Sequence, residues 1–266
     1  MNICLTCDKA YLKYALVTIT SILENNRNGF INFYIMCTHD VTEEYYSDAI
    51  EKLKNKYSNF EIEFVPMTVD TTAFQLNEKS LFNETLLYRL FIPETFPSLD
   101  RMLYLDSDII VRHDITEFYN TEFNECHYIA GVGEDYSYYG RPPPMTYINA
   151  GVVLMDLNRC RSFGFTTKTL AVLKYRCLPY FDQDAINLVC NGKIKLVDPT
   201  YNYCNWTSGM SSSKQKSPTV VHFARTFKKV LEGQHISHAD EWWKYAKMSP
   251  MADQIKQPRI RRSWYY

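Results

Sequence analysis

Asn2-Ile3-Cys4-Leu5-Thr6-Cys7 is an apolar segment at the start of the chain and is predicted to be a short buried strand. Apolar residues then recur at helical spacing between Leu12 and Leu23. The pair of signals repeats, with a strand at 31–37, a helix across 46–57 and an alternating strand at 60–65. Strands that alternate with helices predict an α/β fold, in which helices flank a mixed, mostly parallel, Rossmann-like central sheet.

The rest of the chain continues this alternation and then becomes mainly helical. The expected elements are a helix over about 84–92 that ends before Pro93, a strand at 101–105, apolar segments at 127–132 and 147–155, helices beyond Asn158, and a short strand at 219–223. We expect a main domain at 1–235, followed by a small helical C-terminal extension at 236–266 that packs on it or lies near a membrane.

Composition excludes several classes of protein. A chain of 266 residues with 46% hydrophobic and 22% charged residues can bury a sizeable core, as one large domain or two small ones. Its net charge of −1 gives no attraction to nucleic acid, which we exclude as a partner. No apolar run approaches the roughly 20 residues that span a bilayer, and no signal-peptide pattern is present, so we expect a cytoplasmic location.

The eight cysteines are scattered along the chain, which favours reduced core thiols over a disulfide framework. Cys4 and Cys7 form a C-x-x-C pair. Because no second pair stands at metal-binding spacing, we interpret both as core residues.

The last dozen residues differ in character from the rest of the chain. Basic and aromatic residues together can hold a protein at an anionic membrane surface, here as a peripheral contact at the inner face of the cell membrane. A disordered or packed tail is an equal alternative, because three arginines are fewer than the about 4 to 8 basic residues usual for such binding. The residues concerned are Arg259, Arg261, Arg262, Trp264, Tyr265 and Tyr266.

Asp106-Ser107-Asp108 follows the strand at 101–105. The strand would deliver both carboxylates to the loop at its C-terminal end, the edge at which parallel sheets bind ligands. Carboxylates this close repel unless a cation lies near them, and hard oxygen ligands suit Mg²⁺ or Mn²⁺ together with substrate phosphates. The alternative is a solvated acidic turn, and the short D-x-D pattern alone does not decide between the two.

Further motifs accompany this one in a recognisable order. The whole set resembles the family-8 retaining glycosyltransferases of the GT-A fold, the family that includes glycogenin and bacterial lipopolysaccharide galactosyl- and glucosyltransferases. The resemblance extends from residue 2 to about residue 230. It implies that 1–235 is a catalytic domain that uses Mn²⁺ (or Mg²⁺) to move galactose or glucose from a UDP-hexose donor. The acceptor would be a glycan, glycolipid or glycoprotein, as in cell-surface polysaccharide biosynthesis.

The segment from Leu5 to Tyr11 is similar to the nucleotide-binding start of that family. The resemblance implies that Thr6 and Asp8 meet the polar edge of uracil while Tyr11 stacks on the base. Ala10 stands where some members have Asn, so one polar contact to the nucleotide is expected to be missing. By itself, Asp8 is also well explained as an N-cap of the helix that follows.

Other donor contacts come from the middle of the chain. The resemblance places Asp106 and Ser107 at the diphosphate, and Arg89 at the donor sugar and phosphates, although a surface salt bridge is the alternative for Arg89. Asp135 corresponds to an Asp on the sugar hydroxyls. Asn149-Ala150-Gly151 matches an Asn-Ala-Gly motif, in which Asn offers a donor and an acceptor and Gly lets the backbone approach a ligand.

Asp182-Gln183-Asp184 corresponds to the family's Asp-Gln-Asp, which starts a helix beneath the anomeric carbon. Acidic residues at a helix N-terminus also complement the helix dipole, which explains the two Asp residues but not the Gln between them. Because an amide is a poor nucleophile, we favour front-face transfer in which Gln183 stabilises an oxocarbenium-like centre. Double displacement through Asp182 is the alternative.

His222 is the one histidine that follows a β-branched pair able to end a buried strand at the active edge of the sheet. The resemblance makes it the third metal ligand, with Asp106 and Asp108, and makes Lys228 a diphosphate contact. Many members have Gly shortly after this His and Pro-Trp after the Lys. Here Arg225 and Lys229-Val230 stand instead, which puts details of the diphosphate clamp in question.

Two other functions remain open at this point. A sugar nucleotidyltransferase would also use an α/β fold and Mg²⁺, but it should begin with a Gly- and Arg-rich phosphate loop, and residues 2–15 contain neither residue type. A non-catalytic nucleotide-sugar-binding protein would share the resemblance without the activity.

Overall fold

A seven-stranded sheet forms the centre of the computed structural model, which describes residues 1–74, 83–134, 146–204 and 217–257. Its strand order is β3-β2-β1-β4-β7-β6-β8. The strands are β1 (Asn2–Cys7), β2 (Ile31–Cys37), β3 (Phe60–Pro66), β4 (Arg101–Leu105), β6 (Ile129–Gly133), β7 (Ile148–Asp156) and β8 (Ile194–Leu196). Neighbours pair in parallel except at β7, which is antiparallel to both β4 and β6. The predicted mixed, mostly parallel sheet is confirmed.

A second, three-stranded sheet contains β5 (Ile109–Val111), β10 (Val220–His222) and β9 (Tyr203–Cys204), in that order. We expected the strand at 219–223 to belong to the main sheet, and this was wrong, because β10 pairs with β5 and β9 in the second sheet. In the antiparallel register with β5, His222 is the partner of Ile109. The histidine therefore lies beside Asp108 in the fold, although more than a hundred residues separate the two in the chain.

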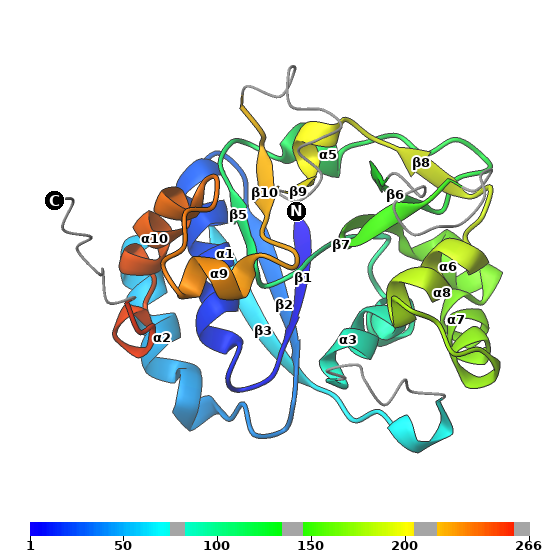
Figure 1. Cartoon of the computed structure of the whole chain (residues 1–266), viewed down its shortest axis with the longest axis horizontal. Coiled ribbons are helices and arrows are strands. Elements are labelled where there is room, and N and C mark those ends of the chain that lie inside the picture. The colour runs from blue at the N-terminus through cyan, green and yellow to red at the C-terminus, as the bar shows by residue number, and fades with distance from the viewer. Residues whose placement is uncertain (75–82, 135–145, 205–216, 258–266) are drawn as a thin grey trace, which may run out of the picture.

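The helices cover both faces of the main sheet. In Figure 1, α1, α2, α9 and α10 lie on one side of it, and α3, α6, α7 and α8 lie on the other. The helices are α1 (Leu12–Asn25), α2 (Glu43–Lys56), α3 (Thr85–Tyr88), α4 (Ile92–Thr95), α5 (Thr116–Tyr119), α6 (Leu157–Phe163), α7 (Phe165–Tyr175), α8 (Phe181–Val189), α9 (Phe227–Leu231) and α10 (Ala239–Met248). Short 3-10 turns are η1 (Thr71–Ala73), η2 (Arg89–Phe91), η4 (Pro199–Tyr201) and η6 (Ala252–Gln254).

Side-chain alternation along β1 explains why the first segment of the chain is apolar throughout. Ile3 and Leu5 pack into one hydrophobic cluster with α1 and α2, whereas Cys4 packs into a second cluster with α3, α6, α7 and α8. A parallel strand covered by helices on both faces needs apolar residues at odd and even positions alike. Six of the eight cysteines are buried, which fits the predicted core thiols, whereas Cys126 and Cys177 are exposed.

The helix expected at 84–92 is wrong in its extent. The chain makes α3, then the η2 turn, then α4, which contains Pro93 rather than ending before it. Proline is tolerated in the first turn of a helix because the N–H that it lacks has no partner within the helix there. The break turns Arg89 out of a regular helix and into the interior, where it is 6% exposed.

The described part of the C-terminal region packs against the domain. Trp242 and Tyr245 of α10 share a hydrophobic cluster with Val17 of α1, and the Arg112 guanidinium pairs with Glu241 at 2.7 Å. The basic and aromatic residues 259–266 fall outside the described residues. Among the helices that the structure describes, none is both long and apolar enough to cross a membrane.

Candidate active site

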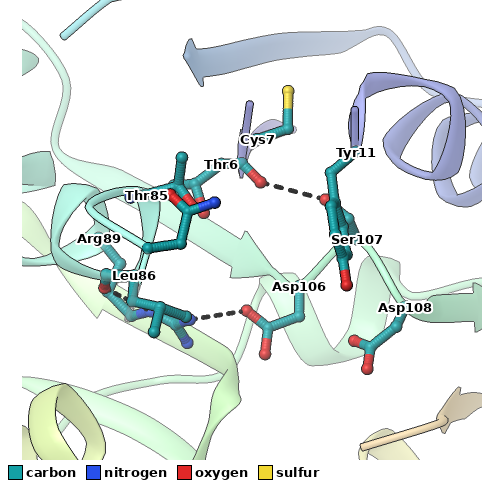
Figure 2. A pocket seen from close by; sticks show the side chains of 10 residues that line it. Thr6, Cys7, Tyr11, Thr85, Leu86, Arg89, Asp106, Ser107 and Asp108 are labelled. Carbon is teal, nitrogen blue, oxygen red and sulfur yellow. Dashed lines mark hydrogen bonds and ion pairs between the residues drawn. The ribbon is translucent and has the colours of Figure 1, made fainter. Parts of the chain in front are cut away.

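A cavity of about 490 Å³ opens at the C-terminal ends of β1 and β4. Thr6, Cys7 and Tyr11 line it from the β1 side, and Asn83, Thr85, Leu86 and Arg89 line it from the α3 side (Figure 2). Asp106, Ser107 and Asp108 complete the lining directly after β4. The cavity thus lies at the edge of the sheet that parallel strands offer to ligands.

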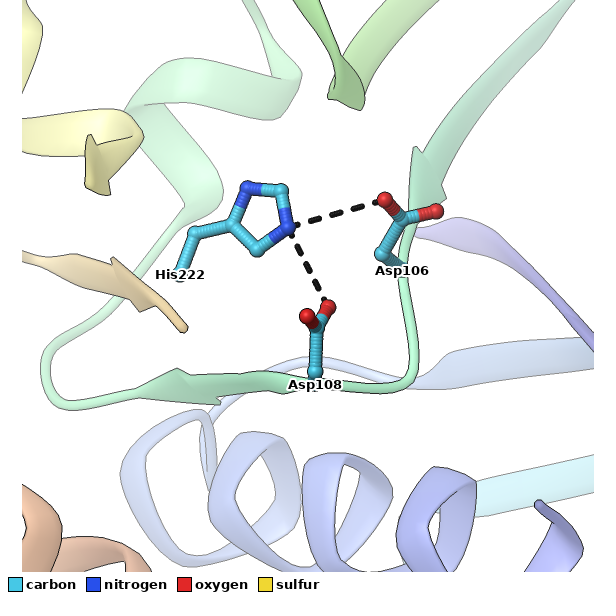
Figure 3. A group of neighbouring side chains, drawn as sticks. All are labelled: Asp106, Asp108 and His222. Atoms are coloured by element: carbon cyan, nitrogen blue, oxygen red, sulfur yellow. Dashed lines mark ion pairs between the residues drawn. The ribbon is translucent and has the colours of Figure 1, made fainter. Parts of the chain in front are cut away.

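Asp106, Asp108 and His222 converge at this edge (Figure 3). The Nε2 atom of His222 lies 3.1 Å from Asp108 Oδ1 and 3.6 Å from Asp106 Oδ2. One ligand atom from each residue falls within 4.8 Å of the other two, a spacing suited to a shared cation. Burial disfavours the charged imidazole, but the Asp108 carboxylate and Cys204 outweigh it and raise the pKa of His222 well above its usual value.

Gly151 of β7 lies directly against this group. A Cβ atom at position 151 would stand 2.5 Å from Asp106 Oδ2 and closer still to Cε1 of His222. The Gly of the Asn-Ala-Gly motif is therefore required by the close approach of the two proposed metal ligands to the β7 backbone. The sequence predicted such an approach, but of a ligand rather than of side chains from the same chain.

Arg89 joins the carboxylates of Asp106 and Asp182. Its guanidinium pairs with Asp106 Oδ1 at 3.0 Å and with Asp182 Oδ2 at 3.1 Å, and it donates to the Ala150 carbonyl at 2.7 Å. It also lies over the Tyr104 ring, 4.5 Å from the centroid. Although burial disfavours its charge, the two carboxylates raise the pKa of the guanidinium. The alternative of a surface salt bridge is wrong, because Arg89 is buried, and so is its partner Asp182.

Asp182 lies in the first turn of α8, 7% exposed. Burial raises the pKa of its carboxyl to about 6, against the effect of Arg89 and with a further contribution from Asp106. Its ion pair with Arg89, at 3.1 Å, holds the carboxylate in place.

Gln183 is held by four hydrogen bonds. Its Oε1 accepts from the backbone N–H of Ala150 at 3.0 Å and from Asn149 Nδ2 at 3.2 Å. Its Nε2 donates to Tyr147 Oη at 3.0 Å and to Glu134 Oε2 at 3.3 Å. Since a backbone N–H can only donate, the Ala150 contact establishes which end of the amide is the oxygen. The carboxamide is therefore fixed in position and in orientation.

Asp184 and Asn187, which follow Gln183 on α8, bond the helix to the residues at the start of β7. Asp184 accepts from Tyr147 Oη at 2.8 Å and from the Tyr180 backbone N–H at 3.0 Å. Asn187, fully buried, accepts from the Ile148 N–H at 2.7 Å and donates to the Ile148 carbonyl at 2.9 Å. One side chain thus replaces a strand partner at the start of β7 and locks α8 to it.

The loop after β1 is more open. Asp8 Oδ1 accepts from the Tyr11 backbone N–H at 2.8 Å, and its Oδ2 accepts from Asn83 Nδ2 at 2.6 Å. Tyr11 is the N-cap residue of α1, so Asp8 closes the turn before the helix and does not cap the helix itself. The Tyr11 ring is 46% exposed and lines the cavity. Ser107, by contrast, is buried and donates to the Thr6 carbonyl at 3.1 Å.

One predicted residue lies away from Asp106, Asp108 and His222, and another falls outside the described residues. Lys228 lies on α9 with its side chain 88% exposed, and its ion pair is with Glu232 at 3.9 Å. Asp135 lies outside the described residues. Its neighbour Glu134, which we passed over, accepts from Asn149 Nδ2 at 3.1 Å and lies beside Gln183. In the sequence, Glu134 is marked only by its position directly before Asp135.

Arg225 stands shortly after His222, where many members of the resembled family have glycine. Its backbone has a φ of 61°, in the left-handed region that favours glycine, so this chain keeps the backbone conformation at some cost in strain. The side chain that it gains lies over the Tyr180 ring, 5.0 Å from the centroid. Tyr180 directly precedes α8, so Arg225 connects the segment after His222 with the start of the Asp182-Gln183 helix.

Comparison with known proteins places this architecture in a class. Two solved structures of the galactosyltransferase LgtC share the fold. An active-site mutant has a TM-score of 0.79 and 20% identity, with 93% of this chain and 96% of that chain covered. A complex with donor and acceptor sugar analogues has a TM-score of 0.76 and 20% identity, with 99% of both chains covered. The fold is therefore the GT-A fold of glycosyltransferases, as predicted.

The family follows from the sequence. Residues 2–229 match Glycosyl transferase family 8, and the chain belongs to that family of glycosyltransferase enzymes. Lipopolysaccharide 1,2-glucosyltransferase of Escherichia coli K12 is 29% identical over 215 residues, which cover 76% of this chain and 62% of that protein. Glycosyltransferase GlyF of Streptococcus pneumoniae is 28% identical over 254 residues, which cover 92% of this chain and 61% of that protein. The matched regions span about three fifths of the length of these curated relatives.

Proposed function

We propose that this protein is a retaining hexosyltransferase that moves galactose or glucose from a UDP-sugar to a sugar-bearing acceptor. One observation carries the proposal. Asp106, Asp108 and His222 converge beside a cavity, and the buried Arg89 connects that group with Asp182 at the start of α8. Charge able to hold a diphosphate and polar groups able to hold a sugar therefore lie side by side. Family membership supports the same reaction class.

The three converging residues suit a divalent cation such as Mn²⁺ or Mg²⁺. Two carboxylate oxygens and one imidazole nitrogen are hard to borderline ligands, and the absence of a Cβ at Gly151 leaves them room to approach one another. A cation bound there supplies positive charge to the departing diphosphate. The chain adds its own charge through Arg89, and Lys228 is the proposed further contact. Thr6, Asp8, Tyr11 and Ser107 are the proposed nucleotide contacts, and Asp135 and Asn149 to Gly151 are the proposed sugar contacts.

For the transfer itself we favour the front-face route. The bond from the anomeric carbon to the β-phosphate oxygen breaks while the acceptor oxygen bonds to the same face. The acceptor proton moves to the departing phosphate oxygen. Gln183 stabilises the positive centre beneath the sugar. The buried ion pair between Asp182 and Arg89 supports this route, because a carboxylate already paired at 3.1 Å is a weaker nucleophile.

Metal-dependent release of UDP tests the function. Wild-type protein with Mn²⁺ and either UDP-glucose or UDP-galactose should release UDP, slowly alone and faster with simple sugar acceptors. Asp108→Asn should abolish the release, whereas Asp48→Asn, the same change at a side chain 78% exposed on α2, should leave it intact. If the wild type released no UDP with any donor and metal, a non-catalytic nucleotide-sugar-binding protein would replace our proposal.

Trapping experiments test the route. Wild type and Gln183→Glu are incubated with donor alone and examined by intact-protein mass spectrometry. A glycosyl adduct on Asp182 of the wild type would overturn front-face transfer in favour of double displacement. An adduct confined to the new carboxylate of the variant would leave it standing.

We further propose that 1–235 is the catalytic domain, that 236–266 is an extension packed on it, and that the protein acts at the cytoplasmic face of the membrane. The packing of α10 against α1 supports the second point. Sedimentation with vesicles that contain anionic lipid, comparing the full chain with a chain ending at Gln257, tests the third. Equal sedimentation of the two chains would contradict a membrane contact through the tail.

A further inference from the structure

A chain of buried amides connects the proposed metal ligand His222 with Gln183. The Nδ1 atom of His222 lies 3.0 Å from Asn202 Oδ1, Asn202 Nδ2 donates to Asn149 Oδ1 at 3.0 Å, and Asn149 Nδ2 donates to Gln183 Oε1 at 3.2 Å. Asn149, Asn202 and His222 are all at most 7% exposed. Asn202 follows the η4 turn, and no motif in the sequence drew attention to it.

Backbone donors fix the direction of this chain. The N–H of Gly151 points at one end of the Asn149 amide at 3.0 Å, so that end must be the oxygen. The group of Asn202 that faces the Asn149 oxygen must then be its NH₂, because two facing acceptors would repel. Asn202 therefore turns its own oxygen toward His222 Nδ1, and that nitrogen must carry a hydrogen to make the bond.

The competing partner of Nδ1 is weaker. Cys204 Sγ lies 3.8 Å from Nδ1 and also 3.7 Å from Asn202 Oδ1. A thiol at these distances is a poor donor and acceptor compared with an amide oxygen at 3.0 Å. Asn202 is thus the dominant contact of the inner side of the imidazole ring.

We propose that Asn202 is a positioning residue that holds His222 in the tautomer with hydrogen on Nδ1, so that the Nε2 lone pair is the one offered to the cation. Nε2 is the nitrogen that faces Asp106 and Asp108. Fixing the tautomer through the second ring nitrogen is how partners outside the ligand set tune a metal-bound His. The inference rests on the proposed metal site and adds to it the residue that orients its nitrogen ligand.

The test compares Mn²⁺ affinity among matched variants, measured by the EPR signal of free Mn²⁺ in the presence of UDP. Asn202→Leu removes the acceptor, and we expect a roughly 10- to 100-fold loss of Mn²⁺ affinity. Asn202→Asp keeps an oxygen for Nδ1–H but sets its second oxygen against the Asn149 oxygen, so it should recover only part of the affinity. The difference between the two isolates the contact with His222 from mere loss of packing.

Asn26→Leu is the control for burial. Asn26 is 1% exposed and bonds to the backbone at Ile22 and Ile115, far from the cavity in the fold. It should lower stability while leaving Mn²⁺ affinity unchanged. Wild-type affinity in Asn202→Leu would overturn the role of Asn202 alone. A wild type that binds no Mn²⁺ would overturn the metal site and the role of Asn202 together.

Discussion

Two regions of the candidate site are built on different principles. The first region, the loop at residues 8–11, is here called the open wall; it presents Tyr11 at 46% exposure, and Asp8 ties it to Asn83. The second region, here called the buried wall, lies outside the cavity lining, and its polar groups bond to one another, to backbone or to side chains such as Arg89. It comprises Asn149, Asp182, Gln183, Asn202 and His222.

The difference between the open wall and the buried wall shows which groups the fold orients before a ligand binds. A side chain that waits for a planar base gains by remaining exposed, because its contact area is unused until the ligand arrives. Groups that must hold a cation and a reacting centre gain from fixed orientation, which the fold supplies in advance. Substitutions in the buried wall should therefore act on both structure and catalysis, and those in the open wall on donor binding alone.

The largest expected effect is that of Gly151→Ala. A methyl group there would overlap with Asp106 and His222, so both ligands must move, and a shift of about 1 Å costs roughly 100-fold in rate. Measuring kcat for sugar transfer and the Mn²⁺ affinity checks this. Gly29→Ala is the control, because a Cβ there meets nothing within 4 Å. Full activity in Gly151→Ala would show that the buried wall is not rigid.

Asn187→Leu should destabilise the fold. It leaves the N–H and the carbonyl of Ile148 without their partner, at about 1–3 kcal/mol for each buried group. Urea denaturation followed by circular dichroism measures the loss. Asn55→Leu, at an exposed position on α2, should change stability by no more than about 0.5 kcal/mol. Equal stability of the two variants would contradict the bracing of β7 by α8.

Tyr11→Ala should weaken UDP binding roughly tenfold while leaving stability nearly unchanged, since base stacking contributes about 1–3 kcal/mol. Isothermal titration with UDP and a thermal melt separate the two effects. Tyr175→Ala, at a tyrosine 73% exposed on α7, is the matched control and should alter neither. A large loss of stability in Tyr11→Ala would erase the distinction between the walls.

The smallest expected effect is that of Lys228→Ala. An exposed charge contributes about 0.2–1 kcal/mol, so UDP affinity should fall by no more than about fivefold. Lys229→Ala, also exposed, should leave UDP affinity unchanged. If the two variants titrate identically with UDP, Lys228 is not a diphosphate contact.

Much of the fold could be predicted, because periodicity reports directly on burial. The apolar run at Asn2–Cys7 and the helical spacing from Leu12 became β1 and α1 as expected. The end of the α3 segment could not be predicted from Pro93, because proline is compatible with both a stop before it and a new first turn around it.

The candidate site divides in the same way. The sequence named Asp106, Asp108 and His222, and the structure brings them together. It did not name Asn202, because an Asn in a turn has no local signal that distinguishes a solvated residue from a buried one. The donor and metal roles of all these residues stay predictions.

The sequence by itself determined the alternation of strands and helices, the order of the motifs, and the delivery of two carboxylates to the end of a strand, since these depend on spacing within a few residues. Tertiary structure alone decided that β7 runs antiparallel beside β4 and that β10 pairs with β5. It also decided that Asn202 reaches Asn149 across 53 residues of chain. Such contacts depend on how whole elements pack, so the sequence around each residue does not predict them.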